Sequence, residues 1–439
     1  MSTNTPNQIL NRLPAKRTAL PIKIDVGEGF TKEYADGLGN IPLIWYNGYP
    51  IEPPDIKFFE LSIIDGLPTM KVTLADSINI MKDRGFPLDD TRISLFINPR
   101  SDLLKPIHMD FKIREFKMVG RNCEIVSVLD VNELYVVNFT AYRKLSSYNL
   151  LKKICGDLGF GFNSNLESSN DVMTWINPGK KLIHFIQDTI DNCFLDDKSF
   201  ILGYFDFYYN YNYVDLQKEL TRDIKNAKGT ADIGINKILK TDQKDALQSI
   251  MLTNDIAFSE SNLFFDKYTV INKSTSISLD RGYKTLIKYY NQVSKEYLFF
   301  NVDSITDSTN TKVILKGKPK DNQFRKQNLE YVYKGKLDID NSHINYLYAD
   351  IQNDRNITDL EKIGLELEMK TPNYNLYRYQ KVGVAISNQA KGINEEFYNA
   401  RLTGDWLIID IKFRLVDIKY RQILTLVKRE LELSQNEKK

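Results

Sequence analysis

The chain has 439 residues, and its 59 lysines and arginines nearly balance its 57 aspartates and glutamates. That balance argues against a dedicated nucleic-acid binder, which usually carries net basic charge or a basic patch. Apolar residues make up 42% and charged residues 26%, as in a folded soluble protein of two to four domains.

Membrane and redox signals are missing from the sequence. No apolar run reaches the ~18 residues that a bilayer span needs, and residues 1–17 lack the apolar core of a signal peptide. We therefore expect no membrane anchor and synthesis in a cytoplasm-like compartment. The three cysteines match no zinc or redox spacing, so we interpret Cys123, Cys155 and Cys193 as reduced core residues.

The N-terminal part of the chain divides into an arm and a β region. Residues 1–21 are polar without a sustained period, and we expect a flexible arm there. Strand signals follow over 22–142, where Met70–Leu74 and Arg92–Ile97 are short candidates. From Ile107 to Arg114 apolar and polar residues alternate, which predicts a strand with one buried face. Val119–Asn122 is a hairpin-type break. Short strands without a βαβ rhythm favour a barrel or a sandwich over 22–142.

A small α/β domain is predicted over 143–218. Ser146 or Ser147 can cap a first helix, and Gly159 can end it in the left-handed conformation. Asn177 is a candidate N-cap for a second helix, with Pro178 at its first position. The apolar stripe of the first helix is Leu151, Ile154, Cys155 and Leu158. That of the second is Leu182, Phe185, Ile186, Ile190 and Cys193.

The run from Phe200 to Val214 is rich in tyrosine and phenylalanine, which suit a half-buried strand. Helices this short persist only when packed, so we expect both to pack on this run. Aromatic side chains could also stack bases or sugars. The run has few basic residues nearby, however, and we favour core and interface roles over ligand binding.

The rest of the chain returns to β signals. A second β region with inserted loops and an accessory subdomain is predicted over 219–430, with a charged tail at 431–439. Its cleanest strand places Ile411, Phe413 and Leu415 on one face, together with Leu407 and Ile409. A turn at 417–420 leads to a return strand over 421–427, which predicts an antiparallel hairpin.

We find no constellation of residues that indicates catalysis, a metal or a cofactor. The three histidines, His108, His184 and His343, have no partner at ligand spacing. The sequence at 159–162, GFGF, lacks the lysine and the spacing of a phosphate loop. The acidic pairs at 89–90, 196–197 and 395–396 are interpreted as solvated turns. We therefore expect no catalytic, cofactor-binding or metal-binding residue, and no enzyme activity.

Several short phrases resemble the baseplate hub proteins of contractile-tailed bacteriophages, a family that includes the T-even baseplate hub and the late-control tail proteins. Most of these positions are structural, so they indicate a fold rather than a site. The matching phrases are Trp175, Asn177 and Pro178; Phe185-Ile186; Tyr204-Phe205-Asp206; Asn212–Leu216; Leu252-Thr253-Asn254; Gly282-Tyr283; and Tyr289-Tyr290.

The resemblance implies a mainly β fold with an α+β insertion: two tail-tube-like antiparallel β-barrel domains and a small α/β domain. It implies a homotrimer whose six barrels form a pseudo-sixfold ring, which would join a hexameric tail tube protein to a trimeric central spike protein. Other baseplate proteins would be further partners, and DNA or a tape-measure protein would pass through the ring. The location would be the virion tail baseplate, assembled in the host bacterial cytoplasm.

Two other classes of function stay open at this point. A tail-associated cell-wall-degrading enzyme would need a convergent acid–nucleophile or metal site. A nucleic-acid-binding phage protein would need a basic groove and would bind with a steep salt dependence. The sequence does not separate a phage tail from a related contractile injection device, and it does not assign residues to the trimer, tube or spike interfaces.

Overall fold

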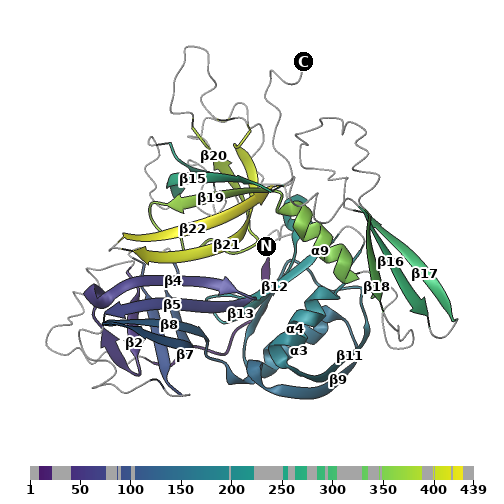
Figure 1. The fold of residues 1–439 in the computed structure, drawn as a ribbon, viewed down its shortest axis with the longest axis horizontal. Helices are drawn as coiled ribbons and strands as arrows, with labels where there is room; N and C mark the ends of the chain where they lie inside the picture. Colours follow the sequence, from purple (N-terminus) through teal and green to yellow (C-terminus); the bar gives the residue numbers. More distant parts are fainter. Residues whose placement is uncertain are drawn as a thin grey trace, which may run out of the picture.

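The computed structural model describes residues 9–21, 41–75, 87, 90–99, 104–196, 199–221, 251–255, 263–273, 284–291, 295–303, 329–334, 346, 349–387, 399, 401–416 and 419–428. Over these residues the strands form four sheets, and the helices are few and short. The prediction of a mainly β protein with small helical parts is therefore confirmed. Figure 1 shows two stacked β regions beside a smaller region that holds the helices α3 and α4.

The first β region is an antiparallel sheet with the strand order β4-β5-β8-β7-β6-β2-β3, so its spatial order differs from the order along the chain. Two of its hairpins turn on residue pairs that adopt positive φ, Asn47-Gly48 and Asp65-Gly66. Such pairs fit the two-residue turns whose twist matches that of the strands. The strands are β2 (Leu43–Tyr46), β3 (Tyr49–Ile51), β4 (Ile56–Ile64), β5 (Leu67–Ala75), β6 (Arg92–Ile97), β7 (Ile107–Val119) and β8 (Asn122–Leu129).

The local strand predictions made for Ile107–Arg114 and for the break at Val119–Asn122 are confirmed, with one difference. The alternation from Ile107 lies in β7, and Gly120 with φ 62° makes the break between β7 and β8. Asp110, however, is buried although it was predicted to face solvent. Its carboxylate accepts hydrogen bonds from Leu20 N (2.8 Å) and Ser94 Oγ (2.6 Å), which replace the lost water.

The second β region pairs its strands in the order β15-β19-β22-β21, with β20 beside β21 and β14 beside β20. The predicted C-terminal hairpin is confirmed as β21 and β22. The elements are β14 (Met251–Thr253), β15 (Phe265–Asn272), β19 (Ile363–Met369), β20 (Lys381–Ala385), β21 (Gly404–Val416) and β22 (Lys419–Lys428).

A β-bulge in β21 changes the predicted facing of its first half. The register shifts between Ile408 and Asp410, so Ile409 is the extra residue and is only half-buried. Beyond the bulge, Ile411, Phe413 and Leu415 are buried as predicted. Before it, Trp406, Leu407 and Ile408 are all buried, so the simple alternation does not extend to the start of the strand.

The two β regions share one continuous sheet. Strand β21 of the second region pairs antiparallel with β4 of the first, through four residue pairs from Phe413↔Leu61 to Val416↔Phe58. At the middle of this seam Arg414 donates two hydrogen bonds to Glu60 Oε2, at 2.9 and 2.6 Å. Among the described strands, the hydrogen-bonded sheet is therefore continuous from the first β region to the second. Closure of either region into a barrel stays a prediction.

The α/β region has a four-stranded sheet, β1-β10-β13-β12, and a two-stranded ribbon, β9-β11. The described part of the N-terminal segment is not a free arm, because β1 pairs with β10 and Leu20 N bonds to Asp110. The elements are β1 (Leu10–Leu13), β9 (Val137–Leu145), α3 (Ser147–Leu158), β10 (Gly161–Ser164), β11 (Met173–Lys181), α4 (Leu182–Asp191), β12 (Ile201–Phe205), β13 (Asn210–Asp215) and α5 (Leu216–Thr221).

The first helix forms as predicted and the second begins later than predicted. Ser146 Oγ accepts from Asn149 N at the start of α3, and Gly159 with φ 78° ends the helix. Asn177 and Pro178 are not a cap and first turn, because both lie inside strand β11 and α4 begins at Leu182. The side chain of Asn177 instead closes a turn over a bulge in β11, which is the other role that asparagine before proline can take.

A helix and a small sheet complete the described chain. Helix α9 (Ala349–Leu360) contacts α4, where Asn353 Nδ2 donates to the backbone oxygens of Asp191 (3.2 Å) and Cys193 (3.1 Å). The small sheet has the order β17-β16-β18 and lies beyond α9 in Figure 1. Its strands are β16 (Lys284–Asn291), β17 (Glu296–Asp303) and β18 (Leu329–Lys334).

Candidate assembly site

The aromatic hairpin of β12 and β13 is the point at which all three regions meet. It was predicted as one strand and is a hairpin with a tight end. At that end the half-buried carboxylate of Asp206 accepts from Tyr208 N (2.8 Å), Asn210 N (2.9 Å) and Asn212 Nδ2 (3.2 Å). Burial raises the pKa of Asp206, and these donors partly oppose the rise. The hairpin end is therefore held by its own side chains.

The hairpin contacts the first β region through two backbone groups. Phe205 N donates to Gly66 O at 2.8 Å, in the β4–β5 turn. Tyr209 OH accepts from Asp110 N at 3.1 Å, in β7. Burial raises the pKa of Tyr209 to about 12, so this hydroxyl stays protonated at neutral pH.

Contacts with the second β region are aromatic and polar together. Tyr204 OH donates to Arg378 O (3.0 Å), and Tyr208 OH donates to Tyr374 O (3.2 Å). The ring of Phe207 meets that of Phe413 edge-on, with 5.8 Å between centroids. The hairpin thus packs between the two β regions at their seam. Most of its aromatic side chains are buried there, which confirms the prediction of a core role over an open stacking surface.

The side chain of Arg378 joins the aromatic hairpin to the bulge in β21. Its guanidinium lies 5.6 Å from the ring centroid of Tyr204 and 5.1 Å from that of Tyr379. Its Nε donates to the carbonyl of Ile409, the bulged residue. A bulge leaves one residue out of the ladder, so that carbonyl can bond to a side chain.

A second polar cluster fastens the α/β region internally. The fully buried carboxylate of Asp171 accepts from Ser147 N (2.9 Å), Ser169 Oγ (2.7 Å) and Phe194 N (3.0 Å). Ser147 Oγ also lies 2.8 Å from Tyr213 OH. Because the carboxylate is satisfied on several sides by groups from different elements, the cluster fixes helix α3 against the sheet.

The predicted core cysteines and polar histidines are placed as follows. All three cysteines are buried and free, as predicted, and burial raises the pKa values of Cys155 and Cys193. His184 is exposed on α4, His108 packs edge-on against Phe96, and His343 lies outside the described residues. In the described part of the chain no three His, Cys, Asp or Glu residues gather as a metal site would require.

Two kinds of surface remain available for assembly. The continuous sheet has three ends, β3, β15 and β14, each paired with one neighbour among the described strands. Thr253 of β14 also bridges to Phe264, the residue before β15. Strand β15 exposes Tyr268, Val270 and Ile271. The ribbon β9–β11 exposes a separate apolar face that includes Phe139 and Ile176. Neither surface could be predicted from the sequence, because periodicity does not say which strands lie at an edge.

No described helix is long and apolar enough to cross a membrane. No protein-family model matches the chain, and no curated protein matches it by sequence.

Solved structures that match this chain at low identity include two tail proteins and a component of a secretion system. A tail protein from Neisseria meningitidis is 9% identical with a TM-score of 0.49, over 88% of this chain and 96% of that one. A 43 kDa prophage tail protein from Shewanella oneidensis is 10% identical with a TM-score of 0.47, over 88% and 98%. An E. coli component of the type VI secretion system, described as similar to T4 bacteriophage tail proteins, is 11% identical with a TM-score of 0.41, over 89% and 79%.

Proposed function

We propose that this chain is the structural hub of a contractile tail, a homotrimer whose ring joins the hexameric tail tube to the trimeric central spike. The observation that carries the proposal is the shared sheet. One chain holds two β regions side by side through the β4–β21 seam, so three chains would supply six such regions. That number lets a threefold object meet a sixfold one.

The free edges of the sheet support the ring. Strand β3 is an end of the sheet in the first region and β15 an end in the second, so a contact between these two different edges of neighbouring copies would be head to tail. A head-to-tail contact closes into a ring when its rotation is right, and it covers the exposed strand edges. The hub would act by holding geometry and transferring load, without turnover, and DNA or a tape-measure protein would pass through its channel.

The mass of the purified full chain in solution tests the proposal. We expect light scattering to give three times 50.9 kDa at raised concentration or with the spike protein present. Val270→Lys should abolish that mass, because lysine on an edge strand opposes pairing with another strand. Val172→Lys is the matched control, since Val172 is also exposed (59%, against 42% for Val270) but lies outside the sheet.

A chain that stays monomeric under all these conditions would overturn the hub proposal. An identical trimer from Val270→Lys and Val172→Lys would instead overturn the head-to-tail contact through β15, because the ring would then form without that edge. Release of soluble fragments from cell walls by the purified chain would instead favour the enzyme alternative.

A further inference from the structure

The outer face of the ribbon β9–β11 is an uncovered apolar surface. Phe139 is 79% exposed, Ile176 58% and Val137 52%. They lie together because Phe139 pairs with Pro178 and Ala141 with Ile176 across the ribbon. Scattered exposed apolar residues need no explanation, whereas a contiguous group on one face indicates an interaction site.

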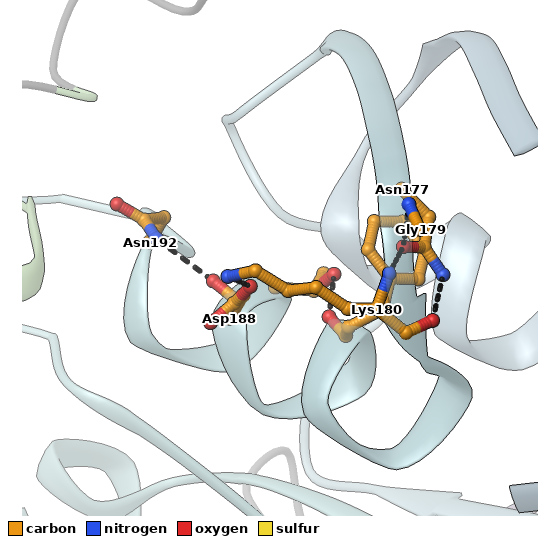
Figure 2. A network of polar contacts seen from close by, with 7 residues as sticks. Asn177, Gly179, Lys180, Asp188 and Asn192 are labelled. Carbon is orange, nitrogen blue, oxygen red and sulfur yellow. Dashed lines mark hydrogen bonds and ion pairs between the residues drawn. The ribbon is translucent and has the colours of Figure 1, made fainter. Parts of the chain in front are cut away.

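The inner face of the ribbon is firmly packed, so the outer exposure does not reflect a loose element. Tyr142 stacks on Phe185 of α4 at 6.0 Å, and Trp175 Nε1 donates to Leu145 O at 2.9 Å. Figure 2 shows how the bulge is held: Asn177 Oδ1 accepts from Lys180 N at 2.8 Å, and Lys180 Nζ pairs with Asp188 of α4.

Phe139 is exposed by a specific arrangement. Gly179 has φ 102°, and a Cβ at this position would lie 2.7 Å from the Phe139 ring. The glycine therefore lets the ring lie against the bulge while it stays on the outer face. A rigid aromatic group at the centre of a surface is the common anchor of protein interfaces.

The charges around this face define what would cover it. Strands β9 and β11 contain four basic residues and no acidic one. Two of the four share the outer face: Lys181 beside Val137 at one end, and Arg143 at the other. Neither forms an ion pair with another described residue. Arg143 lies six residue steps along β9 from Val137, a span of about 20 Å.

We propose that this outer face binds an extended segment of another tail protein, apolar at alternate positions and acidic at both ends. Its apolar side chains would cover Phe139 and Ile176, and its two carboxylates would reach Arg143 and Lys181. The source of the segment rests on the proposed function, but the binding itself does not require the ring. Ring formation and segment binding involve different surfaces and can fail separately.

A designed peptide tests the face on the full chain. The probe is fluorescein-labelled Glu-Thr-Ile-Thr-Ile-Thr-Glu, whose glutamates match the separation of the two cations, and its control carries lysine in place of both glutamates. Fluorescence anisotropy at low salt should give at least tenfold stronger binding of the glutamate peptide. Phe139→Ser should lose at least tenfold in affinity, while Met118→Ser, a change at an exposed apolar residue near the end of β7, should not.

Charge exchange gives the sharpest outcome. The double variant Arg143→Glu, Lys181→Glu should reverse the preference and bind the lysine peptide. Equal binding of both peptides, or binding unchanged in the Phe139 variant, would overturn the proposal. So would two other results: a short DNA duplex that displaces the peptide, which would make the face a nucleic-acid site, or a lower mass of Phe139→Ser in light scattering, which would assign the face to a second copy. A monomeric chain that still discriminates the peptides would refute the hub and keep this inference.

Discussion

Phe413→Ala should be among the most destabilising single substitutions in this chain. The ring is 2% exposed and lies where the hairpin end meets the second β region. Its centroid is 5.1 Å from Tyr374, 5.8 Å from Phe207 and 6.5 Å from Tyr420. Removing a buried phenylalanine side chain costs about 3–5 kcal/mol, because burial is lost and a cavity remains. We expect the free energy of unfolding to fall by this amount.

Urea unfolding followed by tryptophan fluorescence measures the effect. Trp45, Trp175 and Trp406 report on the first β region, the α/β region and the second β region, and all three are buried. The matched control is Phe139→Ala, the same change at a ring that is 79% exposed, which should stay within about 0.5 kcal/mol.

The contact across the junction can be isolated by a double-mutant cycle. Phe207→Ala alone should also destabilise, and the double variant with Phe413→Ala should cost about 0.5–1.5 kcal/mol less than the sum, because one aromatic pair is lost twice in that sum. Strict additivity would mean that the hairpin does not pack on β21. Equal costs for Phe413→Ala and Phe139→Ala would refute the assignment of core and surface.

Three further predictions concern single sites. Burial raises the pKa of Asp215 to about 6, so the unfolded chain, whose carboxyl titrates near 4, loses its proton first as pH rises. Stability should therefore fall by up to about 3 kcal/mol between about pH 4 and 6, and Asp215→Asn should flatten the urea midpoints over that range. Gly161→Ala would place a Cβ 2.0 Å from Asn210 Oδ1 and should cost about 1–3 kcal/mol, with faster hydrogen exchange over 9–21. Asn177→Ala leaves the backbone N–H groups of the β11 bulge without their acceptor and should lower the melting temperature through a loss of about 1–3 kcal/mol, whereas an exposed change such as Met118→Ser should not.

Local patterns predicted the elements whose own residues determine them. Helix α3 begins after Ser146 and ends at Gly159 because the cap and the positive φ are encoded at those positions. Strand β6 was predicted at its observed bounds. The pairs Asn47-Gly48 and Asp65-Gly66 also mark tight hairpins in the sequence, and they could have divided the first β region more finely.

Other features depend on neighbours that are distant in sequence. Asn177-Pro178 suits a helix start or a turn within a strand, and pairing of β11 with β9 decides between them. The burial of Asp110 depends on Leu20 and Ser94, which no local period reveals. The exposed face of β9 was missed for the same reason, since alternation gives two faces but does not say which one a helix covers.

The position of the aromatic hairpin has a consequence for any ring that this chain builds. The seam between the β regions has four described residue pairs, which alone would restrain the angle between the two regions only weakly. The hairpin adds side-chain bonds to both regions, through Tyr209 to Asp110 and through Tyr204 to Arg378. A head-to-tail contact closes into a ring only at one rotation per copy and otherwise forms open filaments. The α/β region would therefore set ring closure without lying at the contact between copies. Weakening the packing between the hairpin and β21, by Phe413→Ala, should then broaden the distribution of assembled masses before it unfolds the chain.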